Sequence, residues 1–419
     1  MSEGKPKIDE ETEEKLEEKR EEILEKHEIH EDFPSYALKE ADEITTDFRE
    51  GIAEEIDEDY RRDVRDLTTF TVDPLRAQDF DDAISIERKE EGWTLWVHIA
   101  DVSHYVTPET ELYKEAKKRA NSVYLPGHTI HMLPPVLAET VCSLVPDEDR
   151  LAHTVRMEIN ERLSFDEIDI FKSVIRSDKR FTYRQAERVL DEGPESVEGV
   201  TDELAKKIEL SYELADELHE TRKEDGSLVL NPKRDRAHTI VEECMLKANR
   251  AVTHELMWNR GVEAMYRVHP QPTEEKWAEA LQEIQELDGV SISAKHWDEP
   301  RIAVNQAIEE ASDSELRKIQ RAVLKVMPRA KYMSDPFGGH YALNFDIYGH
   351  FTSPIRRIAD LINHRIVHEN DVPEDLADLA DYASEKQRMA EAAEREYKKY
   401  LEEVGLDPHE VEEYKMEDE

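Results

Sequence analysis

Apolar and polar positions alternate over three segments in the first quarter of the chain. The segments are TTFTVD (68–73), DAISIER (82–88) and WTLWVHIADV (93–102). This period of two predicts half-buried strands, and Gly92 supplies a turn between the second and third. One face of the third strand is expected to be buried through Trp93, Leu95, Val97 and Ile99. The pattern therefore predicts an antiparallel strand meander.

The remaining pattern is mostly helical. Segments 151–160 and 167–177 predict one more antiparallel pair of strands, while other apolar residues recur with the 3.6-residue period of helices. The expected helices cover these ranges: 109–121, 134–144, 183–192, 201–222, 237–260, 274–288, 302–326, 353–370 and 374–403. The expected fold class is α+β, with an antiparallel β core surrounded by helices.

The two ends of the chain are its most polar parts. Residues 1–32 are almost entirely charged, and their few apolar residues include Ile8, Leu16, Ile23 and Leu24. This composition predicts either a solvated helix with i,i+4 ion pairs or a frayed arm. We therefore expect three parts, namely an acidic helical extension (1–65), a main folded domain (66–404) and an acidic tail (405–419).

Acidic residues extend over the whole chain rather than one tail. The sequence has 100 Asp and Glu against 56 Lys and Arg, which gives a net charge of −44. Such a surface repels nucleic acids at low salt, but at molar salt the Debye length falls to about 3 Å and distant carboxylates act weakly. The composition predicts a halophilic protein that works in concentrated salt; the alternative is a mesophilic protein with a strongly acidic surface.

The sequence favours a reduced, cytoplasmic protein. Its two cysteines, Cys142 and Cys244, cannot build a disulfide framework, and no Cys/His group has the spacing of a zinc site. The first residues lack the apolar centre of a signal peptide, and no stretch approaches the roughly 18 apolar residues that span a bilayer. We therefore expect no membrane partner, and the oligomeric state stays open.

Four carboxylates lie within ten residues of one another in TVDPLRAQDFDDA (71–83): Asp73, Asp79, Asp81 and Asp82. In a dry site each close pair would repel by about 4 kcal/mol at 4 Å and an effective dielectric of 20, so a cation is expected between them. Hard carboxylate oxygens without His or Cys neighbours favour Mg²⁺ or Mn²⁺. The alternative is a solvated turn that holds no metal.

A second candidate segment is HFTSPIRRIADLINHR (350–365). Ser353 followed by Pro354 predicts the start of a helix, with Arg356 in its first turn. A guanidinium beside the free N–H groups of a helix start suits a phosphate. The alternative is a surface i,i+4 ion pair between Arg356 and Asp360.

Two weaker signals point to a polyanion. RKIQRAVLKVMPRAK (317–331) contains Arg321, Lys325 and Arg329 and no acidic residue, which predicts either an electropositive channel or a helix that neutralises acidic neighbours. Tyr124 lies beside a Pro-Gly turn, where its ring could stack on a base. A lone tyrosine is more often part of a core.

Taken together, these segments resemble the catalytic (RNB) domain of the RNase II and RNase R family of exoribonucleases. The likeness runs from about Thr69 to Tyr400. Its motifs, in the family's order, are TVDPLRAQDFDDAISI (71–86), WVHIADVSHYV (96–106), NSVYLPGHTIHMLPPVLAETVCSLVP (121–146), HTIVEECMLKAN (238–249), MYRVHPQPTEEK (265–276), GGHYALNF (338–345) and HFTSPIRRIADLINHR (350–365).

The resemblance implies a hydrolytic 3′-to-5′ exoribonuclease that releases nucleoside 5′-monophosphates from single-stranded RNA with a free 3′ end by two-metal-ion catalysis. It implies Mg²⁺ ligands at Asp73, Asp79 and Asp82, while Asp81 completes the metal cluster or orients the terminal nucleotide. It further implies that Arg356 holds the scissile phosphate and that Tyr124 stacks on the terminal base. Looser matches place two more residues near the 3′-terminal nucleotide: Glu242 and Glu394.

The chain departs from the family pattern in its flanks. Relatives usually carry cold-shock OB domains before this domain and an S1 domain after it, but 1–65 and 405–419 are too short and acidic for an OB barrel. An aromatic that sandwiches bases with Tyr124 in some relatives has no match near 210–230. The rival interpretation is a catalytically silent RNA-binding or regulatory protein on the same scaffold.

Overall fold

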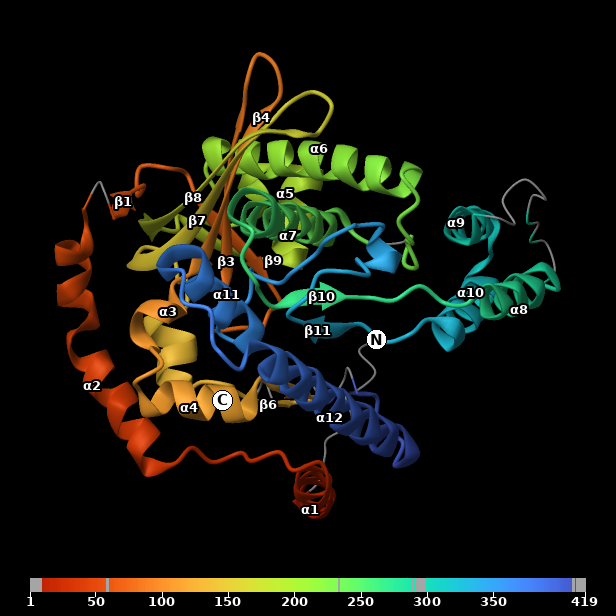
Figure 1. The fold of residues 1–419 in the computed structure, drawn as a ribbon, viewed down its shortest axis with the longest axis horizontal. Coiled ribbons are helices and arrows are strands. Elements are labelled where there is room, and N and C mark those ends of the chain that lie inside the picture. The colour runs from red at the N-terminus through yellow and green to blue at the C-terminus, as the bar shows by residue number, and fades with distance from the viewer. Residues whose placement is uncertain are drawn as a thin grey trace.

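A seven-stranded sheet forms the centre of the protein (Figure 1). The computed structural model describes residues 10–57, 60–232, 234–287, 290, 292, 299–408 and 411. The strand order is β1-β8-β7-β4-β3-β2-β9; all internal pairs are antiparallel, and only the edge strands β1 and β9 pair in parallel. The predicted antiparallel core is therefore confirmed. The strands are β1 (Arg61–Asp63), β2 (Phe70–Asp73), β3 (Asp82–Arg88), β4 (Trp93–Ala100), β7 (Asp149–Ile159), β8 (Phe165–Arg176) and β9 (Lys179–Thr182).

In the described part of the chain, two small two-stranded antiparallel sheets lie outside this sheet, and the first of them is a hairpin. One pairs β5 (Val123–Leu125) with β6 (His128–Ile130), and the other pairs β10 (Tyr266–Val268) with β11 (Lys331–Met333). The first carries Tyr124, so its position matters for the site.

Helices surround the sheet, as the sequence pattern predicts. They are α1 (Glu10–Lys26), α2 (Ser35–Gly51), α3 (Val102–Tyr105), α4 (Glu111–Arg119), α5 (Tyr183–Glu192), α6 (Asp202–Glu224), α7 (Arg236–His254), α8 (Glu274–Gln285), α9 (Pro300–Glu310), α10 (Asp313–Val326), α11 (Ile358–Glu369) and α12 (Leu376–Glu403). Two short π-helical segments also occur among the described residues, Val136–Val141 and Glu255–Arg260. Figure 1 shows α8, α9 and α10 as a small lobe at the right, and this lobe has a hydrophobic cluster of its own.

The prediction that β4 is half-buried is wrong, because every residue of this strand is buried. The strand lies between β3 and β7, and the core covers both of its faces. Hydrogen bonds satisfy the polar side chains on the second face of β4, so these side chains can be buried. His98 contacts the Ser85 hydroxyl through Nε2 at 3.1 Å and the Thr154 hydroxyl through Nδ1 at 2.8 Å.

The single helix expected over 302–326 is two helices. The chain leaves α9 at Ala311, and Ser312 caps α10. The Ser312 N–H donates to the Glu315 carboxylate at 3.0 Å, as in a capping box. The apolar period continues through the break, which is why it concealed the break in the sequence.

The amino-terminal arm forms the expected helix with an i,i+4 ion pair between Lys15 and Glu11, but its apolar side is docked rather than solvated. Leu16, Ile23 and Leu24 of α1 are at most 6% exposed and pack into a cluster with α12 and the β5–β6 hairpin. Of the four apolar residues expected there, Ile8 lies outside the described residues. In the expected tail, Val411 joins the same cluster, while residues 409, 410 and 412–419 also lie outside the described part.

Two further observations concern the whole chain. Across the described residues, every helix is too short or too polar to cross a lipid bilayer. Cys142 and Cys244 are both buried and unbonded to each other.

Candidate active site

The four aspartates meet at one end of the sheet. Asp73 ends β2 and Asp82 begins β3, at the end of the sheet opposite the β3–β4 turn, and the connecting loop carries Asp79 and Asp81. All four line one cavity of about 500 Å³. The structure therefore brings all four carboxylates to one cavity.

Backbone hydrogen bonds hold this loop in place. The Phe80 N–H donates to the Ser143 hydroxyl at 3.0 Å, and the Phe80 carbonyl accepts from the Leu144 N–H at 3.0 Å. The Asp81 carbonyl accepts from the Ala100 N–H at 2.9 Å. Since the backbone groups are satisfied by neighbouring segments, the side chains of Asp79 and Asp81 are free to point into the cavity.

The helix predicted to start at Ser353 starts later, so that prediction is wrong. Helix α11 begins at Ile358, and residues before it form a tight turn. The fully buried carboxylate of Asp360 accepts from the Ser353 N–H at 2.8 Å and from Arg357 Nε at 2.8 Å. These hydrogen bonds, between residues seven and three positions apart, stabilise the turn in place of a helical first turn.

The turn nevertheless presents Arg356 to the aspartates. Asp81 Oδ1 accepts from the Ile355 N–H at 2.8 Å, and Asp81 Oδ2 lies 3.4 Å from Arg356 Nε. The Arg356–Asp360 pair considered as an alternative is wrong, because Arg357 is the residue that pairs with Asp360. The side chain of Arg356 remains 42% exposed, which leaves its guanidinium accessible from the cavity.

Burial and mutual repulsion perturb the carboxylates. Burial, followed by the charge of Asp82, raises the pKa of Asp73 to about 8. Burial raises the pKa of Asp82 to about 6, and it also raises the pKa values of Asp79 and Asp81. Two carboxylate oxygens, Asp73 Oδ2 and Asp81 Oδ2, are buried and accept no hydrogen bond. A positive charge placed among these carboxylates would favour their ionised form and lower these pKa values.

The donor set fits a hard divalent cation. All four candidate ligands are carboxylates, the donor type that Mg²⁺ and Mn²⁺ prefer. Within the described residues, no three His, Cys, Asp or Glu side chains converge closely enough to hold an ion by themselves. Oxygen ligands from water or a phosphate group would therefore have to complete a coordination shell here.

Tyr124 stands between two cavities. It lines the aspartate cavity and an adjoining cavity of about 200 Å³, as does Arg356. The Tyr124 hydroxyl donates to Asp79 at 3.3 Å, and its backbone N–H donates to the Glu394 carboxylate at 3.1 Å. The ring is 37% exposed, so Tyr124 is not a core residue. Glu394 lines the smaller cavity, and burial raises its pKa.

Glu242 projects from α7 into the aspartate cavity. It is paired with two cations, Arg222 at 3.4 Å and Arg234. Its carboxylate is therefore held at the wall by neighbouring residues.

Tyr183, which no sequence motif singled out, lines the aspartate cavity from the first residue of α5. Its ring stacks on His238 with centroids 3.7 Å apart and planes within 3°. The parallel pairing of β2 and β9 places Thr182 beside Asp73 and so brings Tyr183 to the site. No local pattern reveals that pairing.

The basic segment lies elsewhere. Arg321 and Lys325 line a shallow depression on α10, in the small lobe, and Arg329 is exposed in the loop that follows. None of residues 317–331 is among the described residues that line the aspartate cavity. The basic run therefore forms no wall of this cavity, although contact with a longer polyanion outside it stays a prediction.

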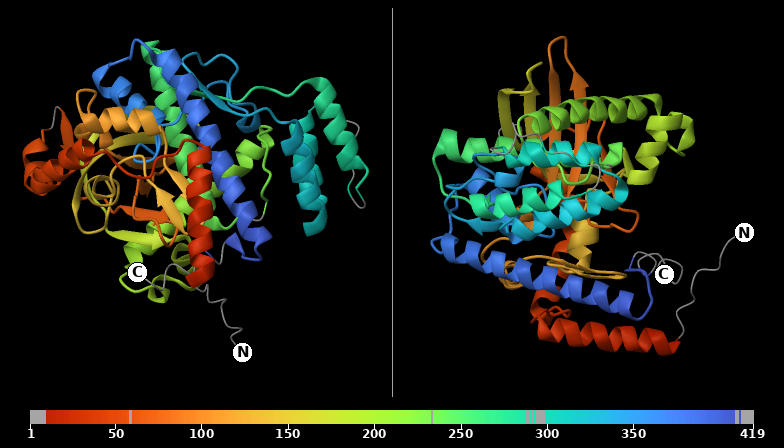
Figure 2. Two further views of the ribbon diagram at one scale, coloured as in Figure 1. Left: turned by 90° about the horizontal axis from the view of Figure 1, so that it is seen from below. Right: turned by 90° about the vertical axis from the view of Figure 1, so that its right-hand side faces the viewer.

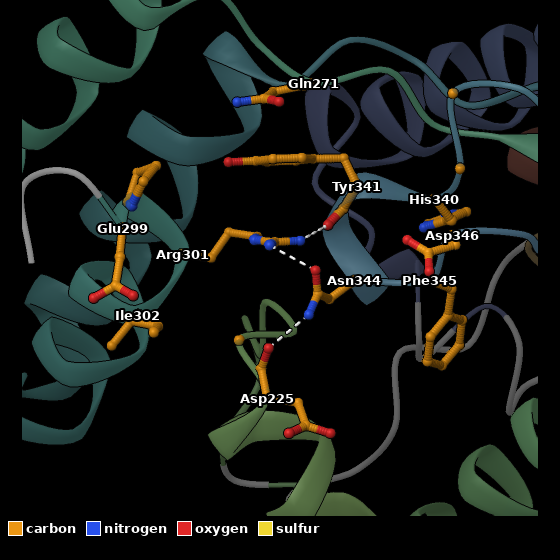
Figure 3. Close-up of a pocket in the computed structure, with 14 residues that line it drawn as sticks. Asp225, Gln271, Glu299, Arg301, Ile302, His340, Tyr341, Asn344, Phe345 and Asp346 are labelled. Atoms are coloured by element: carbon orange, nitrogen blue, oxygen red, sulfur yellow. Dashed lines mark hydrogen bonds between the residues drawn. The ribbon is translucent and has the colours of Figure 1, made fainter.

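A second large cavity, of about 570 Å³, lies between the start of α9 and residues 225–226 and 338–346 (Figure 3). Arg301 lies over the Tyr341 ring at 4.4 Å and donates to Asn344 Oδ1 at 2.7 Å. The described lining of this cavity contains none of the four aspartates. It is thus distinct from the candidate active site.

The geometry agrees with the comparison to known proteins. The sequence pattern of the RNB domain family matches residues 61–370. The chain belongs to the RNB domain family. Ribonuclease R of Aquifex aeolicus is 36% identical over 408 aligned residues, which cover 90% of this chain and 57% of that protein. Ribonuclease R of Escherichia coli is 31% identical and covers 84% of this chain and 48% of its own length. The chain thus spans about half the length of these relatives.

Solved RNB structures share the fold. The apo form of Mycoplasma genitalium RNase R superposes with a TM-score of 0.82 at 25% identity, over 93% of this chain and 64% of that one. Yeast Ssd1, described as a pseudonuclease, superposes with a TM-score of 0.67 at 23% identity, over 81% of this chain and 45% of that one. These superpositions show a shared fold, and the fold alone does not establish nuclease activity.

Proposed function

We propose that this RNB protein is a hydrolytic 3′-to-5′ exoribonuclease that acts on single-stranded RNA with a free 3′ end and releases nucleoside 5′-monophosphates. The observation that carries the proposal is the set of four aspartates facing Arg356 in one cavity. A site of buried carboxylates repels a phosphate unless a cation is bound, so such a site suits catalysis better than simple RNA binding. The similarity to Ribonuclease R supports the same activity. We assign the activity to residues 66–404.

Each side chain has a role that its position allows. Arg356 would bind the scissile phosphate and offset the negative charge that develops on it. Tyr124, at the junction of the two cavities, would stack on the terminal base without selecting its identity. Glu242 and Glu394, on opposite sides of this junction, would contact the 3′-terminal nucleotide.

We assign the cation site to Asp73, Asp79 and Asp82, with Asp81 either as a further ligand or as the residue that orients the nucleotide. Mg²⁺ or Mn²⁺ bound there would activate water for attack on the phosphodiester and stabilise the leaving oxygen, as a pair of ions does in two-metal sites. The Asp81 carboxylate also receives the Ile355 N–H, so it couples the acidic loop to the turn that presents Arg356.

The decisive test is digestion of a 5′-labelled RNA with millimolar Mg²⁺. We expect a ladder that shortens from the 3′ end and releases mononucleotides. Asp81→Asn should lower the rate about a thousandfold, in the range seen when a key electrostatic group is removed, and keep binding of a 3′ single-stranded oligonucleotide. Asp216→Asn, on the exposed side of α6, is the control and should keep the wild-type rate.

The same assay separates the rival function. A silent RNA-binding protein on the RNB scaffold would bind the oligonucleotide and release no mononucleotide with either Mg²⁺ or Mn²⁺. A wild-type rate in Asp81→Asn, in a metal-controlled assay, would refute the assignment of that residue.

A further inference from the structure

The amino-terminal arm shares a hydrophobic cluster with the β5–β6 hairpin that carries Tyr124. Figure 2 shows α1 running beside α12. Three residues of α1 enter one hydrophobic cluster with both hairpin strands and α12. The cluster consists of Leu16, Ile23, Leu24, Val123, Leu125, Ile130, Ala390, Ala393, Tyr397, Leu401 and Val411. The arm therefore packs against α12, and α12 in turn packs against the hairpin strand β5 within the same cluster.

Polar contacts fasten the end of the arm to both partners. Lys26 Nζ and His27 Nε2 lie 2.7 Å and 2.9 Å from the carboxylate of Glu396 on α12. On the hairpin side, His128 Nε2 lies 2.7 Å from the Glu31 carboxylate. The Arg119 guanidinium, just before the hairpin, donates to the Asp32 carbonyl at 2.7 Å. The arm is thus fixed at its apolar face and at its end.

The position of the Tyr124 side chain depends on this packing, because Tyr124 lies on the same strand as two residues of the cluster. Successive side chains of a strand point to opposite faces, so Val123 and Leu125 enter the cluster while Tyr124 points to the cavities. A shift of the strand on the cluster would move the Tyr124 ring by the same amount. Glu394 holds the Tyr124 backbone from α12, the helix against which α1 packs.

We propose that residues 10–33 act as a positioning element for Tyr124, and hence for the terminal base of the RNA. This inference rests on the proposed function, because it assigns a substrate role to Tyr124. It goes beyond the family assignment, since the RNB match begins at residue 61 and excludes the arm. None of the described residues that line the aspartate cavity belongs to the arm, which is linked to the cavity through the hairpin and α12. The arm should therefore affect RNA binding rather than the chemical step.

The test uses Ile23→Ala, which removes the most buried contact of α1, and Glu18→Ala on the exposed face of the same helix as control. Hydrogen exchange of the amides in 123–130 should become about tenfold faster in Ile23→Ala and stay unchanged in the control. KM for a 3′ single-stranded RNA should rise several-fold at constant kcat, because stacking is made equally in the ground and transition states.

A double-mutant cycle tests whether the effect passes through Tyr124. In a Tyr124→Ala background, Ile23→Ala should leave KM unchanged, since the stacking that the arm supports is already lost. An equal rise of KM in both backgrounds would overturn the proposal and indicate a purely structural role. Unchanged exchange in the hairpin would also overturn it.

A milder variant covers the case in which Ile23→Ala fails to fold. Glu396→Gln weakens the polar contacts with Lys26 and His27 but leaves the apolar cluster intact. It should change hairpin exchange and KM in the same direction by a smaller factor, and no change in either would overturn the proposal. Exchange needs no RNA, so it tests the arm independently; a wild-type chain that releases no mononucleotide would instead refute the proposed function.

Discussion

At the residue scale, the candidate site depends on carboxylates whose burial and close approach cost folding free energy. Asp81 is 4% exposed, and one of its oxygens accepts no hydrogen bond. Asp73 and Asp82 repel each other enough to raise the pKa of Asp73, beyond the effect of burial. Such an arrangement destabilises the metal-free protein, and it is tolerated where a bound ion compensates the charge.

The raised pKa values of these aspartates predict how the effect of Mg²⁺ on stability changes with pH. The folded-state pKa values of Asp73, about 8, and Asp82, about 6, exceed the unfolded value. Their contribution to metal-free stability is therefore fully present below about pH 4 and is lost as the pH rises through 6 and 8. Mg²⁺ binds the ionised carboxylates, whereas protons compete with it at low pH.

We expect millimolar MgCl₂ to raise the melting temperature more at about pH 8.5 than at about pH 5.5. Thermal melts at matched ionic strength, with NaCl as the control salt, measure both shifts. Equal shifts at the two pH values would contradict a site made of these aspartates.

The aromatic ring of Tyr124 gives a second prediction. Tyr124→Ala should weaken binding of a 3′ single-stranded oligonucleotide by about 1–3 kcal/mol, because one stacked base is lost. Tyr124→Phe removes only the hydroxyl that donates to Asp79, and it should change binding by about 1 kcal/mol or less. Fluorescence anisotropy in the Asp81→Asn background measures affinity without hydrolysis. An equal loss in both variants would show that the hydroxyl, rather than the ring, contacts RNA.

At the scale of elements, local signals predicted helices well where local interactions stabilise them. The expected range 183–192 coincides with α5, whose capping box is local: the Thr182 N–H donates to Gln185 Oε1 and the Gln185 N–H to Thr182 Oγ1. The helix expected to begin at Ser353 does not form there, because the buried Asp360 carboxylate binds the Ser353 N–H and the Arg357 guanidinium. A different set of short-range hydrogen bonds outweighs the capping preference of Ser353 there.

The cap of α5 can be tested directly. Thr182→Ala should lower the free energy of unfolding by about 1 kcal/mol, because the Gln185 N–H loses its acceptor. Thr182→Ser keeps a hydroxyl in place and is the matched control. Urea unfolding followed by circular dichroism measures both variants, and an unchanged Thr182→Ala would mean that the cap does not stabilise this helix.

At the scale of the whole molecule, the charge of −44 sets the response to salt. Self-repulsion of such a surface opposes the compact state, and salt screens it. We propose that the protein is adapted to concentrated salt, and we expect its free energy of unfolding to increase between about 0.1 M and 2 M KCl. Urea unfolding at each salt concentration measures this. A constant or falling value would favour the alternative, a mesophilic protein with an acidic surface.

The sequence by itself determined the element types, the antiparallel core and the identity of the acidic cluster. These properties follow from period, propensity and spacing over a few residues, as with the four aspartates between 73 and 82. Likewise, the RNB resemblance rests on motifs that are each contiguous.

Only the tertiary structure decided what those motifs contact. The Ile355 N–H meets Asp81 across 274 residues of chain, and the Tyr124 N–H meets Glu394 across 270. Packing likewise decided the burial of β4 on both faces and the docking of α1. Such contacts depend on the apolar area that is buried over the whole core. A local pattern shows which residues are apolar, but not which distant surface will cover them.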